Sequence, residues 1–238
     1  MNKALKHAFK AWQSLLPDKN YRTSLIIGFI WILAALYANV SISTYNETFI
    51  GSGVGDLILD NIPTVNLNYF YTIGIYVILW SFAAFAFFRP ELVPFALKTF
   101  AIFILVRSFF IVLTHIGPPQ EYFSLAGPDK DSHFLHKFFY LNDLFFSAHT
   151  GIPFLAFLLL KGSIYRYFYL LASIIMGATV LLMHVHYSID VFGAFFITYS
   201  IYHLSDGIFH KLNKSFSSIV KAFEEHEEKL LKQIPKKY

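Results

Sequence analysis

The sequence predicts an all-α fold: a polytopic membrane protein with six transmembrane helices and both termini in the cytoplasm. Of the 238 residues, 56% are apolar and only 14% are charged, against about 25% charged residues in soluble domains. The apolar residues form long runs with few or no charges, and a membrane crossing needs about 20 such residues. The basic residues are distributed asymmetrically around these runs, which is the pattern that orients membrane proteins.

Six runs are long enough to cross a bilayer. A buried core of a soluble protein is the alternative, which so many runs in so short a chain disfavour. The first run follows a polar, basic segment and exceeds the apolar core of a signal peptide, so we expect an uncleaved signal anchor. The expected spans are 23–43, 68–88, 94–115, 143–161, 164–184 and 186–205.

The basic residues also predict the orientation of the chain. With both termini cytoplasmic, 16 of the 19 Lys and Arg residues lie inside, Lys130 and Lys137 lie outside, and Arg107 lies within a span. This is the positive-inside pattern, so the basic residues need no nucleic-acid partner. The expected parts are a cytoplasmic segment, a membrane catalytic domain and a charged cytoplasmic tail, covering 1–22, 23–205 and 206–238.

Two long loops are expected on the non-cytoplasmic side. The loop 44–67 contains GSGVGD, whose glycines indicate turns. The loop 117–142 is polar and long enough to fold over a site at that face. The acidic and histidine residues of this second loop and of the start of the fourth span are Glu121, Asp129, Asp131, His133, His136 and Asp143.

The stretch 183–190, MHVHYSID, places three ionisable side chains in a largely apolar part of the chain. An ionisable residue at membrane depth indicates a functional site. His186 and Asp190 are four residues apart, so on a helix they share one face. A carboxylate beside an imidazole fixes its tautomer and stabilises the imidazolium, which makes histidine a better base or nucleophile.

Two further residues are expected at the same depth. His149 precedes His186 by 37 residues, which corresponds to about two membrane crossings joined by a turn at 161–163. Arg107 lies in the outer half of the third span, where its guanidinium requires an anionic partner and its planar fork suits phosphate. The sequence therefore predicts that two histidines, an aspartate and an arginine converge at one site.

Metal binding is an alternative interpretation, because His is a common metal ligand. His184 and His186 would point about 200° apart on a helix, so only a bent segment would let both hold one ion. We expect no metal and no cofactor, and the absence of Cys excludes thiolate ligands. Histidines that form structural hydrogen bonds near the membrane interface are a further alternative.

The motifs DLFFSAHT at 143–150 and HYSIDVFGAFFIT at 186–198 resemble the paired motifs of the sphingomyelin synthase family, a branch of the type 2 phosphatidic acid phosphatase superfamily. The family motifs read approximately Cys-Gly-Asp-Tyr-x-Tyr/Phe-Ser-Gly-His-Thr and His-Tyr-Thr-x-Asp-Val-x-x-Ala-Tyr-Tyr-Ile-Thr. LVRSFFIVLTHIGPP at 105–119 is similar to the family's segment that ends one span with an Arg and a Pro-rich turn, and LLPDK at 15–19 is faintly similar to its Pro-Leu-Pro-Asp. The resemblance covers most of residues 95–200.

The resemblance implies a six-span enzyme acting on lipid head groups at the non-cytoplasmic leaflet of a bacterial inner membrane or a eukaryotic secretory-pathway membrane. It implies that His186 attacks phosphorus, that Asp190 orients His186, and that His149 protonates the departing oxygen. Arg107 and backbone amides near Ser147 would stabilise the phosphoryl charge. Supporting positions are expected at Asp143 and His184.

Some residues depart from the family pattern. Ala148 stands where the family usually has Gly, which removes the freedom for a left-handed backbone. The superfamily's Lys-x6-Arg-Pro signature is missing, and Val180 stands where an Arg is expected six residues before the nucleophile. In lacking these residues the sequence resembles the synthase branch. Their absence disfavours an ordinary lipid phosphatase, which binds a dianionic monoester with more cationic side chains.

The sequence thus predicts a lipid phosphotransferase that moves a phospho-head-group from a glycerophospholipid to ceramide or diacylglycerol through a phosphohistidine. A phosphatase or phospholipase C-type hydrolase using the same residues stays open, because the difference depends on whether water or a second lipid reaches the site. A transporter or scramblase, in which His149, His186 and Asp190 form a proton relay, is an alternative from another class. A haem or metal carrier is a third.

Overall fold

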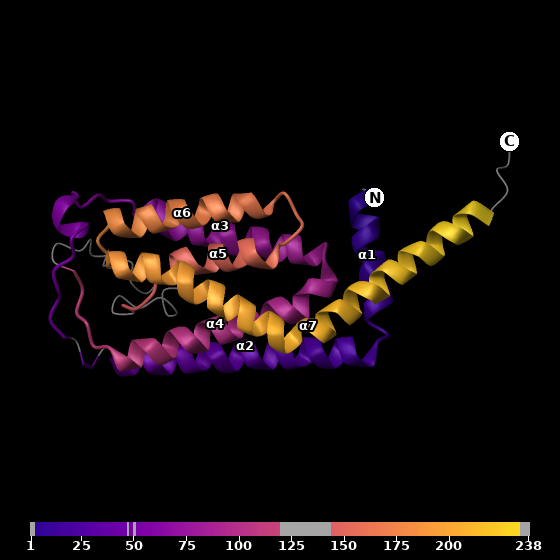
Figure 1. The fold of residues 1–238 in the computed structure, drawn as a ribbon, viewed down its shortest axis with the longest axis horizontal. Coiled ribbons are helices and arrows are strands. Elements are labelled where there is room, and N and C mark those ends of the chain that lie inside the picture. Colours follow the sequence, from indigo (N-terminus) through magenta and orange to yellow (C-terminus); the bar gives the residue numbers. More distant parts are fainter. Residues whose placement is uncertain (1–2, 47, 50, 120–143, 234–238) are drawn as a thin grey trace.

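The computed structural model describes residues 3–46, 48–49, 51–119 and 144–233, and these residues form helices and loops without a strand. The all-α prediction is confirmed for this part of the chain (Figure 1). The α helices are α1 (Lys3–Leu15), α2 (Lys19–Asn46), α3 (Asn68–Phe87), α4 (Val93–Leu113), α5 (Ala148–Leu159), α6 (Arg166–Leu182) and α7 (Ser188–Gln233). The short 3₁₀ helices are η1 (Leu59–Asn61) and η2 (Pro90–Leu92).

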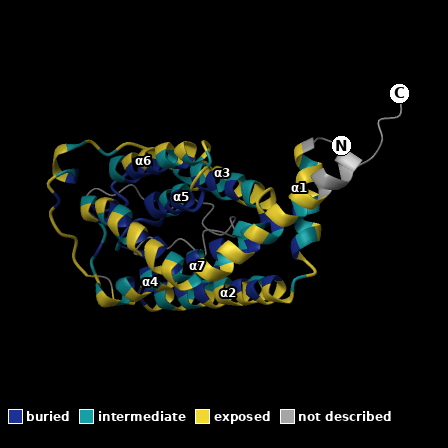
Figure 2. Ribbon diagram, turned by 45° about the vertical axis from the view of Figure 1, so that its right-hand side comes forward, coloured by how far each residue is buried: buried dark blue, intermediate teal, exposed yellow. Residues whose placement is uncertain are grey.

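The helices form two groups joined by α7. In the first group α2 lies along α4, and in the second α5 packs against α6 while α3 contacts both (Figure 1). The first half of α7 contacts both α4 and α5. Helices α3, α6 and α7 thus pack around α5, most of whose residues are buried (Figure 2).

Three stretches are long and apolar enough to cross a membrane: α2 with 28 residues, α3 with 20, and Pro90–Leu113 with 24. Their large apolar side chains are often exposed, as at Leu33 and Trp80. The buried residues of α2 are mainly small or polar, which is typical of helix packing within a membrane. They are Tyr21, Ser24, Gly28, Ala35, Asn39, Ser43 and Asn46.

Two of the expected spans are shorter helices. α5 has 12 residues, about 18 Å of helix, where a span over 143–161 was expected. α6 has 17 residues and nearly fills the expected 164–184. They are joined by a turn at the expected place, in which Gly162 has a φ of 84°, a backbone conformation that glycine adopts without steric cost.

The N-terminal and C-terminal segments pack together at one end of the bundle (Figure 1). The expected polar segment 1–22 contains α1, which buries Ala8, Ala11 and Leu15 at helical spacing. Ala11 and Leu15 belong to a small apolar cluster with Phe216 of α7. α7 is continuous across position 205, so the boundary expected between 23–205 and 206–238 lies within one helix.

Candidate active site

The turn between α6 and α7 has a left-handed residue at His184. Its φ is 51°, which makes it the one non-glycine residue with positive φ in the described part of the chain. The His184 N–H donates to the Leu181 carbonyl over 2.9 Å, and the Val185 N–H donates to the Val180 carbonyl over 3.1 Å. This is the Schellman arrangement, which normally has glycine at the His184 position. The left-handed conformation costs about 1–2 kcal/mol for a residue with a Cβ.

This turn places His186 before α7 rather than on it. His186 Nδ1 lies 3.1 Å from Asp190 Oδ2, and the same oxygen accepts the Tyr187 N–H over 3.1 Å. Asp190 therefore binds back to the residue that precedes the helix, as the acidic member of a capping box does. A carboxylate accepts hydrogen bonds, so in the neutral imidazole the hydrogen is on Nδ1 and the lone pair is on Nε2.

The N-terminus of α5 lies against this pair. The Ser147 N–H donates to the Asp190 carbonyl oxygen over 3.0 Å, which ties the start of α5 to the start of α7. The Ser147 side chain is fully buried, and its hydroxyl has no hydrogen-bond partner among the described residues. Ala148 is the first residue of α5 and has no positive φ. The backbone conformation at this position therefore does not require the glycine that the family usually has.

His149 lies in the first turn of α5 and is buried. The Tyr71 ring of α3 stacks on its imidazole, with ring centroids 3.9 Å apart and planes inclined by 26°. His149 interacts electrostatically with His186 and Arg107. The two histidines that the sequence predicts to converge are therefore neighbours.

Arg107 reaches this group from α4. Its side chain is buried, and its Nε–H donates to the Phe146 carbonyl oxygen over 3.4 Å. Phe146 immediately precedes Ser147, so the guanidinium lies beside the start of α5. The described structure thus brings together side chains from α4, the N-terminus of α5, the α6–α7 turn and the first turn of α7, namely Arg107, Ser147, His149, His186 and Asp190.

Of the two expected supporting residues, His184 lies within the described structure and Asp143 does not. His184 is buried and its Nδ1 lies 3.3 Å from the Thr64 hydroxyl, while its Nε2 has no hydrogen-bond partner among the described residues. The turn at 183–187 is the bend that a shared metal ion would require, but the described residues contain no group of three potential metal ligands. Asp143 lies outside the described residues, together with Glu121, Asp129, Asp131, His133 and His136.

Sequence reasoning missed Asp56, which holds the loop after α2 against the α6–α7 turn. Its carboxylate accepts the N–H of Ser188 over 2.7 Å and the N–H groups of Ile58 and Leu59 over 2.9 and 3.2 Å. Ser188 is the first residue of α7, so Asp56 caps that helix from 132 positions away. A lone Asp after a glycine-rich stretch carries no sequence signal for such a contact.

Tyr187 makes the neighbouring contact between the same segments. Its hydroxyl donates to the Gly117 carbonyl over 2.9 Å and accepts the Val54 N–H over 3.1 Å. A side chain at Gly51 would collide with the His115 carbonyl, and one at Gly117 would collide with the Gly51 backbone. The expected turn glycines at this point therefore permit two backbone segments to approach closely beside the site.

The pKa of Asp56 is set by opposing effects. Burial raises the pKa of the carboxyl. The hydrogen bonds from the N–H groups of Ser188, Leu59 and Ile58 together lower the pKa by more than burial raises it, so the pKa of Asp56 lies below the usual value. A depressed pKa in the folded state gives stability that is present above the unfolded-state pKa and lost as the pH falls through the folded-state pKa. The stabilisation from this carboxylate is therefore constant around neutral pH. It is lost only in acid, below pH 3.8, which is the ordinary pKa of an aspartate.

Replacing Asp56 with Ala is expected to destabilise the protein by about 1–2 kcal/mol, because a helix cap and its partners are lost. The start of α7, which carries Asp190, should also lose its fixed position. Thermal unfolding measures the loss of stability, and hydrogen exchange of the backbone amides at the start of α7 measures the local effect. Asp60→Ala, at an exposed carboxylate four residues away in the same loop, is the matched control. Equal behaviour of the two variants would show that the contact is not important.

The arrangement presents a guanidinium, two imidazoles and a carboxylate around the buried start of a helix. A helix N-terminus attracts anions through its free N–H groups and its dipole, and a guanidinium matches phosphate oxygens. An imidazole whose Nδ1 is held by a carboxylate has a nucleophilic Nε2. These groups together are suited to binding a phosphate and transferring it. No protein-family model, curated protein or solved structure matches this chain.

Proposed function

We propose that this protein is a membrane lipid phosphotransferase that moves a phospho-head-group from a glycerophospholipid to a lipid alcohol through a phosphohistidine at His186. The observation that carries the proposal is the buried pair of His186 Nδ1 and Asp190 Oδ2, 3.1 Å apart. This pair adjoins a second histidine, a buried arginine and the N-terminus of α5. The resemblance of the two motifs to the sphingomyelin synthase family supports the same chemistry.

We propose a six-span topology in which α5, α6 and the first half of α7 complete the three long apolar stretches. Both termini are cytoplasmic in this proposal, as the distribution of Lys and Arg predicts. The candidate site lies towards the end of the bundle opposite to α1 and the far end of α7 (Figure 1). The site then faces the non-cytoplasmic leaflet, where the phosphates of outer lipids lie.

In the first step His186 Nε2 attacks the phosphorus atom of the donor lipid. A P–N bond forms and the P–O bond to the glycerol oxygen breaks, in line with one another. The diacylglycerol oxygen takes its proton from His149 and leaves. The negative charge of Asp190 stabilises the phosphorylated, cationic imidazole, which keeps its hydrogen on Nδ1. The stack with Tyr71 holds the His149 ring in one plane.

In the second step the acceptor alcohol enters and His149, now neutral, removes its proton. The alcohol oxygen attacks phosphorus, the P–N bond breaks, and His186 returns to its starting state. Each step is a single displacement, which is the advantage of covalent catalysis. Water in place of the alcohol would complete a hydrolysis with the same residues.

Arg107 and the start of α5 stabilise the charge that develops on the phosphoryl oxygens. Both are preorganised: the guanidinium is positioned against the Phe146 carbonyl, and α5 is held through Ser147 and Asp190. The buried Ser147 hydroxyl is available to donate to a phosphoryl oxygen. Donors fixed in advance in a site of low polarity lower the barrier more than the same donors in water.

The proposal is tested with purified protein in mixed vesicles of phosphatidylcholine, phosphatidylethanolamine, ceramide and diacylglycerol. Products are identified by mass spectrometry. A phosphosphingolipid, or head-group exchange onto labelled diacylglycerol, is the expected result. A free phosphorylated alcohol identifies the hydrolase instead. An unchanged lipid composition at all pH values from 5 to 9 contradicts the proposal.

Replacing Arg107 with Lys is expected to lower kcat/KM about 10- to 100-fold, because a point charge cannot reproduce the two parallel hydrogen bonds of a guanidinium to phosphate. Initial rates in the vesicle assay measure the effect. Arg89→Lys is the matched control, since Arg89 is exposed and pairs with Glu91 over 2.6 Å. Wild-type rates for Arg107→Lys would remove Arg107 from phosphate binding.

A further inference from the structure

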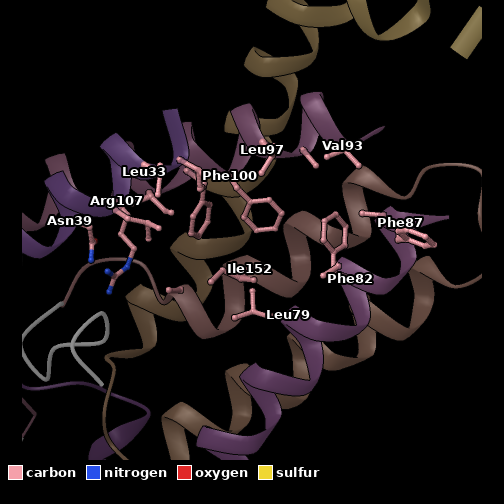
Figure 3. Close-up of a pocket in the computed structure, with 18 of the residues that line it drawn as sticks. Leu33, Asn39, Leu79, Phe82, Phe87, Val93, Leu97, Phe100, Arg107 and Ile152 are labelled. Atoms are coloured by element: carbon pink, nitrogen blue, oxygen red, sulfur yellow. The ribbon is translucent and has the colours of Figure 1, made fainter. Parts of the chain in front are cut away.

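A cavity of about 750 Å³ lies between the α2–α4 pair and helices α3 and α5 (Figure 3). This volume lies within the range of about 300–1,000 Å³ typical of ligand sites. Its walls are apolar over nearly their whole extent, with polar groups contributed by Asn39, Arg107 and the indole of Trp12. Leu33 both lines the cavity and is 65% exposed, so the cavity opens sideways to the lipid-facing surface.

One end of the cavity meets the candidate active site. Arg107 and Asn39 lie together at this end, whereas Phe87 and Val93 lie at the other (Figure 3). Ala148, which is flanked by Ser147 and His149, also lines the cavity. A molecule whose phosphate binds Arg107 would therefore have an apolar space directly beside that phosphate.

The length of this space suits a lipid chain. Arg107 and Val93 both lie on α4, 14 positions apart, which corresponds to about 21 Å along a helix. One leaflet of a bilayer has a hydrocarbon depth of about 15 Å, half of a core of about 30 Å. The cavity is therefore longer than one leaflet is deep, which gives room for an acyl chain that begins at the site.

Trp12 of α1 lies at the far end. Its indole N–H donates to the Phe87 carbonyl over 2.9 Å, and its ring contacts those of Phe87 and Tyr21. α1 is itself held against α7 through the cluster of Ala11, Leu15 and Phe216. These contacts hold the indole in one position at the end of the cavity.

We propose that this cavity holds one acyl chain of the phosphate-donor lipid and that Trp12 sets the longest chain that fits. The inference rests on the proposed function for the position of the phosphate. The donor is the occupant because its phosphate complements the Arg107 guanidinium, and a ceramide or diacylglycerol acceptor carries no phosphate. A chain that moves from the bilayer into the cavity exchanges one apolar environment for another, so selection depends on fit rather than on hydrophobic gain.

The first experiment compares rates for phosphatidylethanolamine donors whose chains lengthen in steps of two carbons. In the wild-type protein the rate should fall once the chain reaches Trp12, by about 5- to 150-fold, because overpacking costs about 1–3 kcal/mol. Trp12→Ala should move this limit to longer chains, and Trp12→Phe should keep it near the wild-type length. Trp80→Ala is the matched control, since Trp80 is exposed on α3 and does not line the cavity.

The second experiment does not depend on turnover. Phosphatidylethanolamine with a photoreactive diazirine at the end of a 16-carbon chain is incubated with the protein, the sample is illuminated, and the adducts are mapped by mass spectrometry. Adducts should concentrate at Trp12, Phe87 and Val93. The same lipid with a mid-chain diazirine should label Leu79 and Phe100 instead.

The outcomes separate the two proposals. Terminal adducts at Trp12 without any lipid turnover would contradict the phosphotransferase and leave the chain site standing. Turnover with adducts confined to exposed positions such as Ile30 and Trp80 would overturn the chain site alone. A chain-length limit that is identical in Trp12→Ala and wild type would overturn the role of Trp12. Labelling by photoreactive diacylglycerol in place of the donor would assign the cavity to the acceptor.

Discussion

Replacing His186 with Ala is expected to abolish lipid turnover, with a loss in kcat of about four orders of magnitude or more, the scale seen when the nucleophile of a covalent mechanism is removed. No P–N bond can form without Nε2, although Arg107 and His149 still bind the phosphate and supply a proton. The phosphorylated protein should therefore also be lost. It is measured with a donor lipid carrying radioactive phosphorus, and phosphohistidine is recognised because it survives alkali and is labile in acid.

Two further variants keep this result interpretable. His186→Asn retains an N–H that can donate to Asp190 as Nδ1 does, so the turn should stay folded while the nucleophile is lost. His210→Ala is the matched control: His210 and Asp206 form a pair of the same residue types four positions apart on α7, 3.5 Å apart, with His210 exposed and Asp206 half-buried. Appreciable turnover or phosphoprotein in His186→Asn would contradict the role of His186 as nucleophile.

Replacing Asp190 with Asn is expected to slow turnover by about 100- to 10,000-fold, in the range seen when the aspartate beside a catalytic histidine loses its charge. The carboxylate oxygen that meets His186 also accepts the Tyr187 N–H, and the amide oxygen of Asn can accept both. The variant therefore keeps the start of α7 and loses the negative charge that stabilises the cationic phosphohistidine. Single-turnover rates of phosphoprotein formation measure this loss, with thermal unfolding as the readout of the fold.

Asp190→Ala removes both hydrogen bonds as well as the charge, so it should be less stable than Asp190→Asn and at least as slow. Asp206→Asn, in the pair of His210 and Asp206 on the same helix, should leave the rate unchanged. If Asp190→Asn formed the phosphoprotein at the wild-type rate, the pair of His186 and Asp190 would be a structural cap and nothing more.

The long apolar helices were predictable from the sequence. The expected span 68–88 corresponds to α3 over Asn68–Phe87, and the expected 94–115 lies close to Pro90–Leu113. Both predictions depend on local properties, namely the length of an apolar run and the charges or prolines that bound it. The limits of α5 were not predictable in this way, because the apolar run begins well before the helix does.

Part of the candidate site was also predictable. Ionisable residues are rare in the apolar segments, so Arg107, His149, His186 and Asp190 are conspicuous in the sequence, and the number of crossings between them predicts a common depth. The pairing of His186 with Asp190 follows from their spacing, although His186 lies before α7 instead of within it. The contacts of Tyr71 and Asp56 with the site leave no such local pattern.

The sequence by itself determined that the described chain is helical, that its long helices are apolar enough for a membrane, and which polar side chains such helices would bring to one depth. These properties follow from composition and spacing along the chain. The tertiary structure decided the left-handed turn at His184, the cap that Asp56 places on α7, and the cavity that ends at Trp12. Those features join residues as far apart as 75 and 132 positions, and contacts at such separations depend on how the helices pack, which no local run of residues encodes.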